Sequence, residues 1–180
     1  YDAESGDAWG PYGLGYYVAG RTMWDVAEAE RVDEIVDDFL TRAFGPARKP
    51  MAAFYELIAV DRTRRSSADL IGRMYRHLAE ARKLAADDEA VRRRIDDLIL
   101  YTRYAELYYR FASATGKAKG SAKKDLLRYI YRIRETMMIH AYGLWARLAS
   151  QRAANDKDNP LRDSTPVAEA ELLEFLRKGI

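Results

Sequence analysis

Histidine side chains are the first candidates for metal or acid–base chemistry in this sequence. There are two, His77 and His140, and neither belongs to a Glu-x-x-His pair or to a second histidine at i, i+4. Such patterns are what bring metal ligands together on one helix face. His140 follows the apolar run 137–139, so we expect a hydrogen-bonded, half-buried histidine rather than a base. The chain has no cysteine, which excludes disulfides, thiolate zinc sites and cysteine nucleophiles. The sequence therefore predicts no metal and no cofactor.

Carboxylates form two runs, at 87–89 and at Asp96-Asp97. Adjacent residues on a helix point away from each other, so neither run can hold one substrate atom between two acids. We interpret them as helix caps and solvated faces. The sequence thus predicts no catalytic residue within this chain.

Two other segments could bind ligands. Gly13 and Gly15 bracket Leu14 at the start of a helix, but a phosphate-binding loop would need a preceding strand and a third glycine. The segment 101–111, YTRYAELYYRF, could stack on sugar rings or bases. Core packing with the hydroxyls at the surface is the interpretation that we favour.

Length and composition indicate one domain, or one domain with a piece of another. Of the 180 residues, 48% are hydrophobic and 32% charged, and no apolar run is long enough for a membrane span. The net charge of +2 conceals an acidic start (−7 over 1–44) and a basic middle (+11 over 45–152). Because the basic residues are mixed with acids over several helices, we expect solvated helix faces and no nucleic-acid or membrane partner.

Hydrophobic periodicity predicts an all-α fold, an irregular antiparallel bundle of about six to seven helices. The predicted helices cover 13–24, 32–44, a stretch from Pro50 to about 61, 66–86, 87–112, 121–154, and a short helix that begins at Thr165-Pro166. The fifth helix carries an apolar seam at Val91, Ile95 and Leu98. We expect it to lie at the core, antiparallel to the sixth helix and its Ile133.

The first predicted helix is unusually rich in aromatic and small residues. It reads GLGYYVAGRTMW, and an acidic segment without an initiator Met or a secretory signal precedes it. We therefore expect the chain to be a fragment or a processed product. Its cellular location stays open.

Residues 9–51 carry a resemblance to a known family. The combination includes several short matches: Trp9-Gly10-Pro11, Gly13, Tyr16-Tyr17, Arg21, Met23-Trp24-Asp25, Phe39, the run 43–47, and Met51. In these features, and in RYIYRIRETMMIHAY at 128–142, the chain resembles the C-terminal part of the bacterial glycoside-hydrolase-like family called domain of unknown function 4838. That family is similar to alpha-glucuronidases and hexosaminidase-type barrels.

The resemblance implies a (β/α)8 barrel upstream in the same polypeptide. Residues 1–25 would be the last loop and helix of that barrel, 26–154 a helical accessory domain, and 155–180 a polar loop with a short helix. Glu4, Trp9 and Tyr12 would then face substrate, and Tyr16, Tyr17, Met23 and Trp24 would pack between domains. The chain itself would catalyse nothing, and the parent, which could be secreted or periplasmic, would break down a glycan containing uronic acid or hexosamine.

Two alternatives remain at this stage. The chain could be a free-standing helical interaction module, and a homodimer is a further expected partner. It could also be a basic nucleic-acid binder, which would require salt-sensitive binding.

Overall fold

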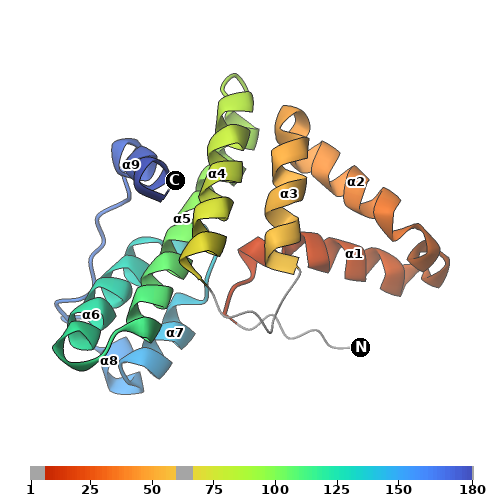
Figure 1. The fold of residues 1–180 in the computed structure, drawn as a ribbon. Coiled ribbons are helices and arrows are strands. Elements are labelled where there is room, and N and C mark those ends of the chain that lie inside the picture. Colours follow the sequence, from red (N-terminus) through yellow and green to blue (C-terminus); the bar gives the residue numbers. More distant parts are fainter. Residues whose placement is uncertain (1–6, 60–66, 180) are drawn as a thin grey trace.

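The computed structural model describes residues 7–59 and 67–179. All regular structure in these ranges is helical, which confirms the predicted all-α bundle. Figure 1 shows α1 to α3 grouped on one side of α4 and α5, with α6 to α9 on the other. The α-helices are α1 Gly13–Trp24, α2 Val32–Phe44, α3 Arg48–Ala59, α4 Ala68–Leu84, α5 Glu89–Ser113, α6 Gly116–Arg132, α7 Ala141–Leu148, α8 Gln151–Asn155 and α9 Glu169–Gly179.

Side-chain caps begin two of the core helices, close to the predicted starts at 66 and 87. The Ser67 hydroxyl accepts a hydrogen bond from the Leu70 amide at 3.1 Å, and an Asp88 carboxylate oxygen accepts one from the Val91 amide at 3.0 Å. Each bond satisfies an amide that has no partner inside the helix. Gly45 ends α2 with φ of 44°, a conformation that glycine adopts without strain.

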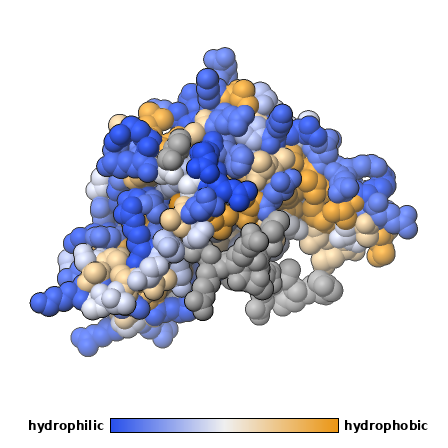
Figure 2. Space-filling view, viewed as in Figure 1, coloured by the Kyte–Doolittle hydropathy of each residue, from blue (hydrophilic) through white to orange (hydrophobic). Residues whose placement is uncertain are grey.

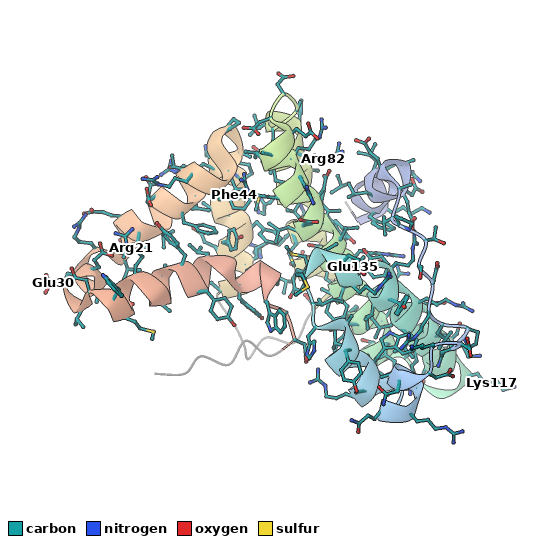
Figure 3. The ribbon with its side chains drawn as sticks, turned by 180° about the vertical axis from the view of Figure 1, so that it is seen from behind. Arg21, Glu30, Phe44, Arg82, Lys117 and Glu135 are labelled. Atoms are coloured by element: carbon teal, nitrogen blue, oxygen red, sulfur yellow. The ribbon has the colours of Figure 1, made fainter. Side chains whose placement is uncertain are left out.

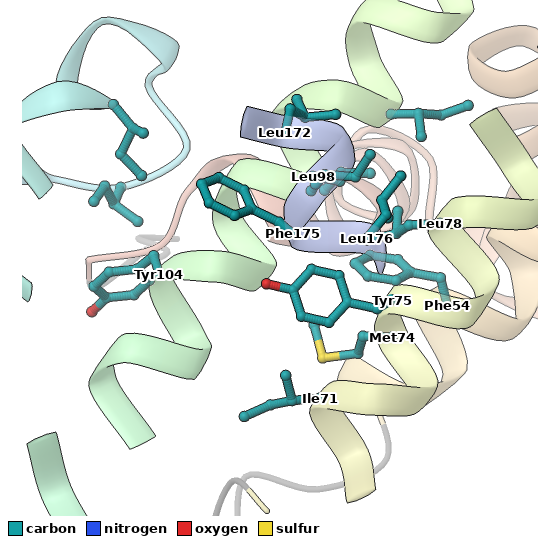
Figure 4. Close-up of a cluster of buried hydrophobic side chains, with 14 of the residues drawn as sticks. Phe54, Ile71, Met74, Tyr75, Leu78, Leu98, Tyr104, Leu172, Phe175 and Leu176 are labelled. Atoms are coloured by element: carbon teal, nitrogen blue, oxygen red, sulfur yellow. The ribbon is translucent and has the colours of Figure 1, made fainter. Parts of the chain in front are cut away.

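Helix α5 lies at the centre, as predicted. Val91, Ile95 and Leu98 are buried, and Ile133 is 1% exposed. The helix packs against α2, α4, α6 and α9, and only a short turn joins it to α6. Figure 4 shows the side of this core where Tyr75 of α4 and Phe175 of α9 lie next to α5. The C-terminal helix is therefore part of the core.

The predicted sixth helix is wrong in its extent. The structure ends α6 at Arg132 and turns the chain at Met137, whose φ is 57°. The His140 amide donates to the carbonyl of Asp7 at 2.9 Å, so it does not continue a helix. This contact from the N-terminal segment lies at the break between α6 and α7, and a second break at Ser150, which caps α8, separates α7 from α8.

Two predicted boundaries are also wrong. Helix α6 begins at Gly116 rather than near Ser121, because the Ala and Lys residues of this segment are good helix formers. The last helix begins at Glu169 rather than at Thr165-Pro166. Arg132 donates to the carbonyls of Thr165 and Pro166, which holds this stretch in a non-helical conformation.

The first two helices form an arm that extends from the core. Figure 3 shows Arg21 and Glu30 at its far end and Phe44 where α2 returns to the core. Phe44 is 2% exposed and lies 5.9 Å from the ring of Tyr55 on α3. The arm is therefore anchored at its base, and its outer end meets few other elements.

Candidate functional site

Helix α1 is apolar but buries none of its twelve residues. It packs on α2 and on the short 3-10 helices on either side of it, η1 (Gly10–Tyr12) and η2 (Val26–Arg31). A helix that is hydrophobic around its circumference is normally enclosed on several sides. Part of the surface of α1 therefore lacks a neighbour within the described ranges.

The inner face of α1 is fixed to α2 by Tyr17. Its ring centroid lies 5.4 Å from that of Phe39, and its hydroxyl donates to Asp38 at 2.7 Å. Arg21 donates to the Tyr17 oxygen at 3.2 Å and through Nε to Glu28 at 2.6 Å. Tyr17, one of the predicted interdomain residues, thus faces α2.

These contacts also affect the acids of the arm. The Arg21 guanidinium, by donating to Glu28, holds the pKa of that carboxyl below its usual value. Hydrogen bonds from Arg42 and then from Tyr17 lower the pKa of Asp38. Both acids stay ionised at neutral pH, so they fix the inner side of α1 electrostatically.

A second side of α1, here called the outer face, consists of Tyr16, Gly20 and Met23, preceded by Tyr12 of η1. These residues follow at intervals of four, four and three, which places them on one side of a helix. Trp24, the last residue of α1, adjoins this face at the helix end. Met23 is 49% and Trp24 94% exposed, and Val26 beyond them is 78% exposed. Figure 2 shows hydrophobic surface on the part of the molecule formed by α1 to α3. Adjacent exposed large apolar side chains usually mark an interaction site.

Glycines within α1 are consistent with close approach by another molecule or domain. A Cβ atom added to Gly15 or Gly20 would meet nothing within 4 Å. Glycine in a helix interior is nevertheless less stable than alanine by about 0.5–1 kcal/mol. Nothing in the described part of the chain accounts for that cost.

Two of the three predicted substrate-facing residues, Trp9 and Tyr12, lie in the described part of the chain. Glu4 lies outside the described residues. Trp9 stacks on His140 with the ring centroids 5.3 Å apart and the planes 18° apart, while Tyr12 is 44% exposed. Asp7 forms an ion pair with Arg147. The segment before α1 therefore packs on the α6–α7 connection.

The two acids of the run Asp96-Asp97 have different surroundings. Burial raises the pKa of Asp97, and Arg93 partly opposes this effect. Its neighbour Asp96 instead accepts a hydrogen bond from Arg82 at 2.7 Å. The described residues also contain no group of three or more acids and histidines that could hold a metal ion. In these same ranges, no helix has the length and hydropathy needed to cross a membrane.

A groove between α5, α6 and α9 contains several arginines. It measures about 260 Å³, and most of its guanidinium groups have acidic partners. Arg132 donates to Glu171 at 2.7 and 2.6 Å, and Arg103 donates to Glu106 at 2.6 Å. The charges of this groove are therefore largely neutralised within the protein.

A second hollow of about 220 Å³ lies where α6 gives way to α7 and α8. We call it the Tyr131 hollow; its walls include Tyr131, Arg134, Tyr142, Trp145 and Arg162. The sequence prediction missed it, because it placed Tyr131 and Trp145 on one continuous helix and Arg162 in a polar loop. Only the break at Met137 brings these side chains together. In the sequence, a tyrosine and a tryptophan with arginines nearby form too common a pattern to indicate a binding hollow.

Comparisons with known proteins give no relatives. No protein-family model matches the sequence, no curated protein is similar to it, and no solved structure matches its fold. Functional interpretation therefore depends on the geometry of the chain.

Proposed function

We propose that this chain is a non-catalytic helical accessory domain that docks through the outer face of α1 onto another domain. The observation that carries the proposal is an apolar helix with no buried residue. Docking would remove the exposed parts of Met23 and Trp24 from water, which is favourable in proportion to the apolar area covered. The glycines at 15 and 20 would let the docked surface approach the helix backbone.

The docking partner that we propose is a (β/α)8 barrel of a glycoside-hydrolase-like protein in the same polypeptide. The resemblance at residues 9–51 supports this partner, since it implies that α1 is the last barrel helix. In this arrangement carbohydrate is bound and cleaved by the barrel. Glycoside hydrolysis requires two carboxyl groups about 5–9.5 Å apart across one cleft. In the two acidic runs of this chain, Asp96 is paired with Arg82 and Asp88 caps α5.

Self-association is the alternative use of the same face. The outer face could cover its counterpart in a second copy, as expected of a free-standing interaction module. The two occupants differ in how coverage depends on concentration. Coverage by a domain of the same polypeptide is independent of protein concentration, whereas coverage by a second copy is lost on dilution.

Thiol labelling tests the proposal directly, because the chain has no cysteine of its own. Gly20→Cys places one thiol on the outer face, and Lys117→Cys places a control thiol on exposed surface at the start of α6. We expect Gly20→Cys to react at least tenfold more slowly in the polypeptide that includes the barrel than in the isolated chain. The Lys117→Cys rate should be equal in both.

Equal Gly20→Cys rates in the two proteins would refute docking to the barrel. Protection that appears in the isolated chain only at high concentration would assign the face to a homodimer instead. Turnover of aryl glycosides or glucuronides by the isolated chain would refute the non-catalytic assignment.

A further inference from the structure

The Tyr131 hollow holds two positive charges beside one aromatic ring. The guanidinium carbon of Arg134 lies 4.3 Å, and that of Arg162 5.3 Å, from the centroid of the Tyr131 ring. Stacking on the ring favours each cation. The two charges nevertheless repel each other, and an anion bound near both would relieve this repulsion.

Arg162 retains hydrogen-bonding capacity. It donates from Nη2 to the carbonyl of Ala154, and its Nε is buried without a hydrogen-bond partner in the described part of the chain. No ion pair to Arg162 occurs in those ranges. Because this Nε is closed off from solvent, a ligand in the hollow would bond to the Nη groups of Arg162, whose charge no acid in those ranges neutralises. The Arg103 Nε is also buried without a partner, but Arg103 is paired with Glu106.

Arg134 is only weakly neutralised. Its Nε lies 3.0 Å from the carboxylate of Glu135, and Glu135 is 81% exposed in its side chain. Exposed ion pairs of this kind are screened by solvent and can be exchanged at little cost. Its Nη1 donates to the carbonyl of Tyr131 at 2.8 Å, which fixes the guanidinium next to the ring. Both arginines can therefore supply donors to one anionic group.

The remaining wall of the hollow is aromatic. The Tyr131 and Trp145 centroids are 6.0 Å apart, and the Trp145 indole N–H donates to the carbonyl of Leu127 at 3.0 Å, which fixes its orientation. Tyr142 lines the opening and is 49% exposed. At about 30 Å³ per water, the hollow has room for roughly seven waters, which suits one ring-sized molecule.

We propose that the Tyr131 hollow binds a small ring-shaped monocarboxylate. The ring packs against the aromatic side chains, and the carboxylate accepts hydrogen bonds from Arg162 and Arg134. Guanidinium groups match a carboxylate with two parallel donors, and aromatic faces accept either a sugar ring or an aromatic ring. A uronic-acid sugar and an aromatic acid share this chemistry. The site is separate from the outer face of α1, so it does not depend on the docking proposal.

Nuclear magnetic resonance of the ¹⁵N-labelled chain tests the site. The probes are glucuronate, benzoate, glucose and inorganic phosphate, and the observed signals are the Arg162 Nε–H and the Trp145 indole N–H. A ligand of this size binds with a dissociation constant on the order of 1 mM. We expect glucuronate, benzoate or both to shift the two signals saturably, and glucose to leave them unchanged. Glucuronate alone would indicate a uronic sugar, and benzoate alone an aromatic acid.

Variants locate the binding. Arg162→Gln should weaken carboxylate binding at least tenfold, and Tyr142→Ser, at an exposed position, should weaken it at least threefold without affecting the fold. Arg128→Gln, an exposed arginine of the other groove, should bind as the unchanged chain does.

The proposal is overturned if neither carboxylate shifts the signals, if glucose shifts them equally, or if phosphate alone binds. It is also overturned if Arg128→Gln reduces binding as much as Tyr142→Ser. The comparison of Arg128→Gln with Tyr142→Ser remains decisive even if Arg162→Gln does not fold.

Discussion

Helices α1 and α5 have opposite surroundings. Both are rich in tyrosine and apolar residues, yet α5 buries seven residues and α1 buries none. Neighbours account for the difference: α5 is packed by α2, α4, α6 and α9, whereas α2 is the only α-helix among the main neighbours of α1. An apolar helix thus contributes to stability only where other elements cover it. The outer face of α1 offers surface that a partner can cover.

The largest expected contrast between the two helices is in the effect of removing an apolar side chain. Leu98 of α5 is 2% exposed, so Leu98→Ala should reduce the free energy of unfolding by about 2–5 kcal/mol. Met23→Ala on α1 should change it by less than about 0.5 kcal/mol, as at other surface sites. Urea denaturation of the isolated chain measures both. Equal losses would mean that the outer face of α1 is buried.

Gly10 joins the arm to the core, and its replacement should have the second-largest effect. A Cβ at this position would lie 2.9 Å from the Cα of Met138, so backbone has to move. Gly10→Ala should cost about 1–3 kcal/mol, the range for overpacking. It should also shift the Trp9 indole signal, since Trp9 stacks on His140. Gly120→Ala, where a Cβ meets nothing, is the matched control. Wild-type stability in Gly10→Ala would contradict the described packing.

Replacing Gly20 by alanine should have a smaller effect on stability, and of opposite sign to that of Gly10→Ala. Since a Cβ has open space there, Gly20→Ala should stabilise the isolated chain by about 0.5–1 kcal/mol. In the proposed complex with a barrel, the added methyl should instead weaken the contact. Thermal unfolding of the isolated chain checks the first effect. The second effect is checked by the rate of thiol labelling of Tyr16→Cys in the longer polypeptide, with and without Gly20→Ala. If Gly20→Ala leaves the protection of this thiol unchanged, the partner does not closely approach the backbone at Gly20.

The smallest expected effect concerns the pH dependence at Asp97 on α5. Burial raises its pKa in the folded state, so the protonated form is favoured there. The resulting stability is fully present below the unfolded pKa of about 3.9 and is lost as pH rises through the folded pKa. Asp97→Asn should therefore be more stable than wild type near pH 7, with the gain shrinking below pH about 4.

Asp96→Asn is the matched control for this titration. It removes the hydrogen-bonded ion pair with Arg82, so it should reduce stability near pH 7 by up to about 1 kcal/mol. Denaturation of both variants between pH 3 and pH 8 gives the comparison. A loss of stability in Asp97→Asn at pH 7 would mean that its charge has a favourable partner.

Local patterns predicted the core well. The apolar seam at Val91, Ile95 and Leu98 is set by residues close in sequence, and the structure buries it as expected. Two helix starts, near residues 66 and 87, were also predicted, and the structure has them capped by Ser67 and Asp88. Period and capping are properties of a single helix, so sequence alone is enough to find them.

The break at Met137 could not be predicted in this way. The apolar period continues through residues 133–141, but the His140 amide bonds to Asp7, more than a hundred residues away. Interactions of this range have no signature in a local window. The same limit applies to the Tyr131 hollow, which exists because that break folds α7 and α8 back and because Arg162 arrives from a distant loop.

The outer face of α1 could be predicted from the sequence only in part. The resemblance implied an interdomain role for Tyr16, Tyr17, Met23 and Trp24. In the structure the Tyr17 hydroxyl donates to Asp38, while Met23 and Trp24 are exposed. Composition marked the helix, but only the packing of α2 determines which side of it remains uncovered.

Amide hydrogen exchange of the isolated chain, repeated with the barrel present, tests the central claim most directly. At low protein concentration, α5 amides should exchange only through global unfolding, and α1 amides should exchange through local opening at a clearly lower free energy. With the barrel present, α1 protection should rise while α5 is unchanged. Protection of α1 equal to that of α5 in the dilute isolated chain would contradict the claim that α1 lacks a neighbour, and so would α1 protection that the barrel leaves unchanged.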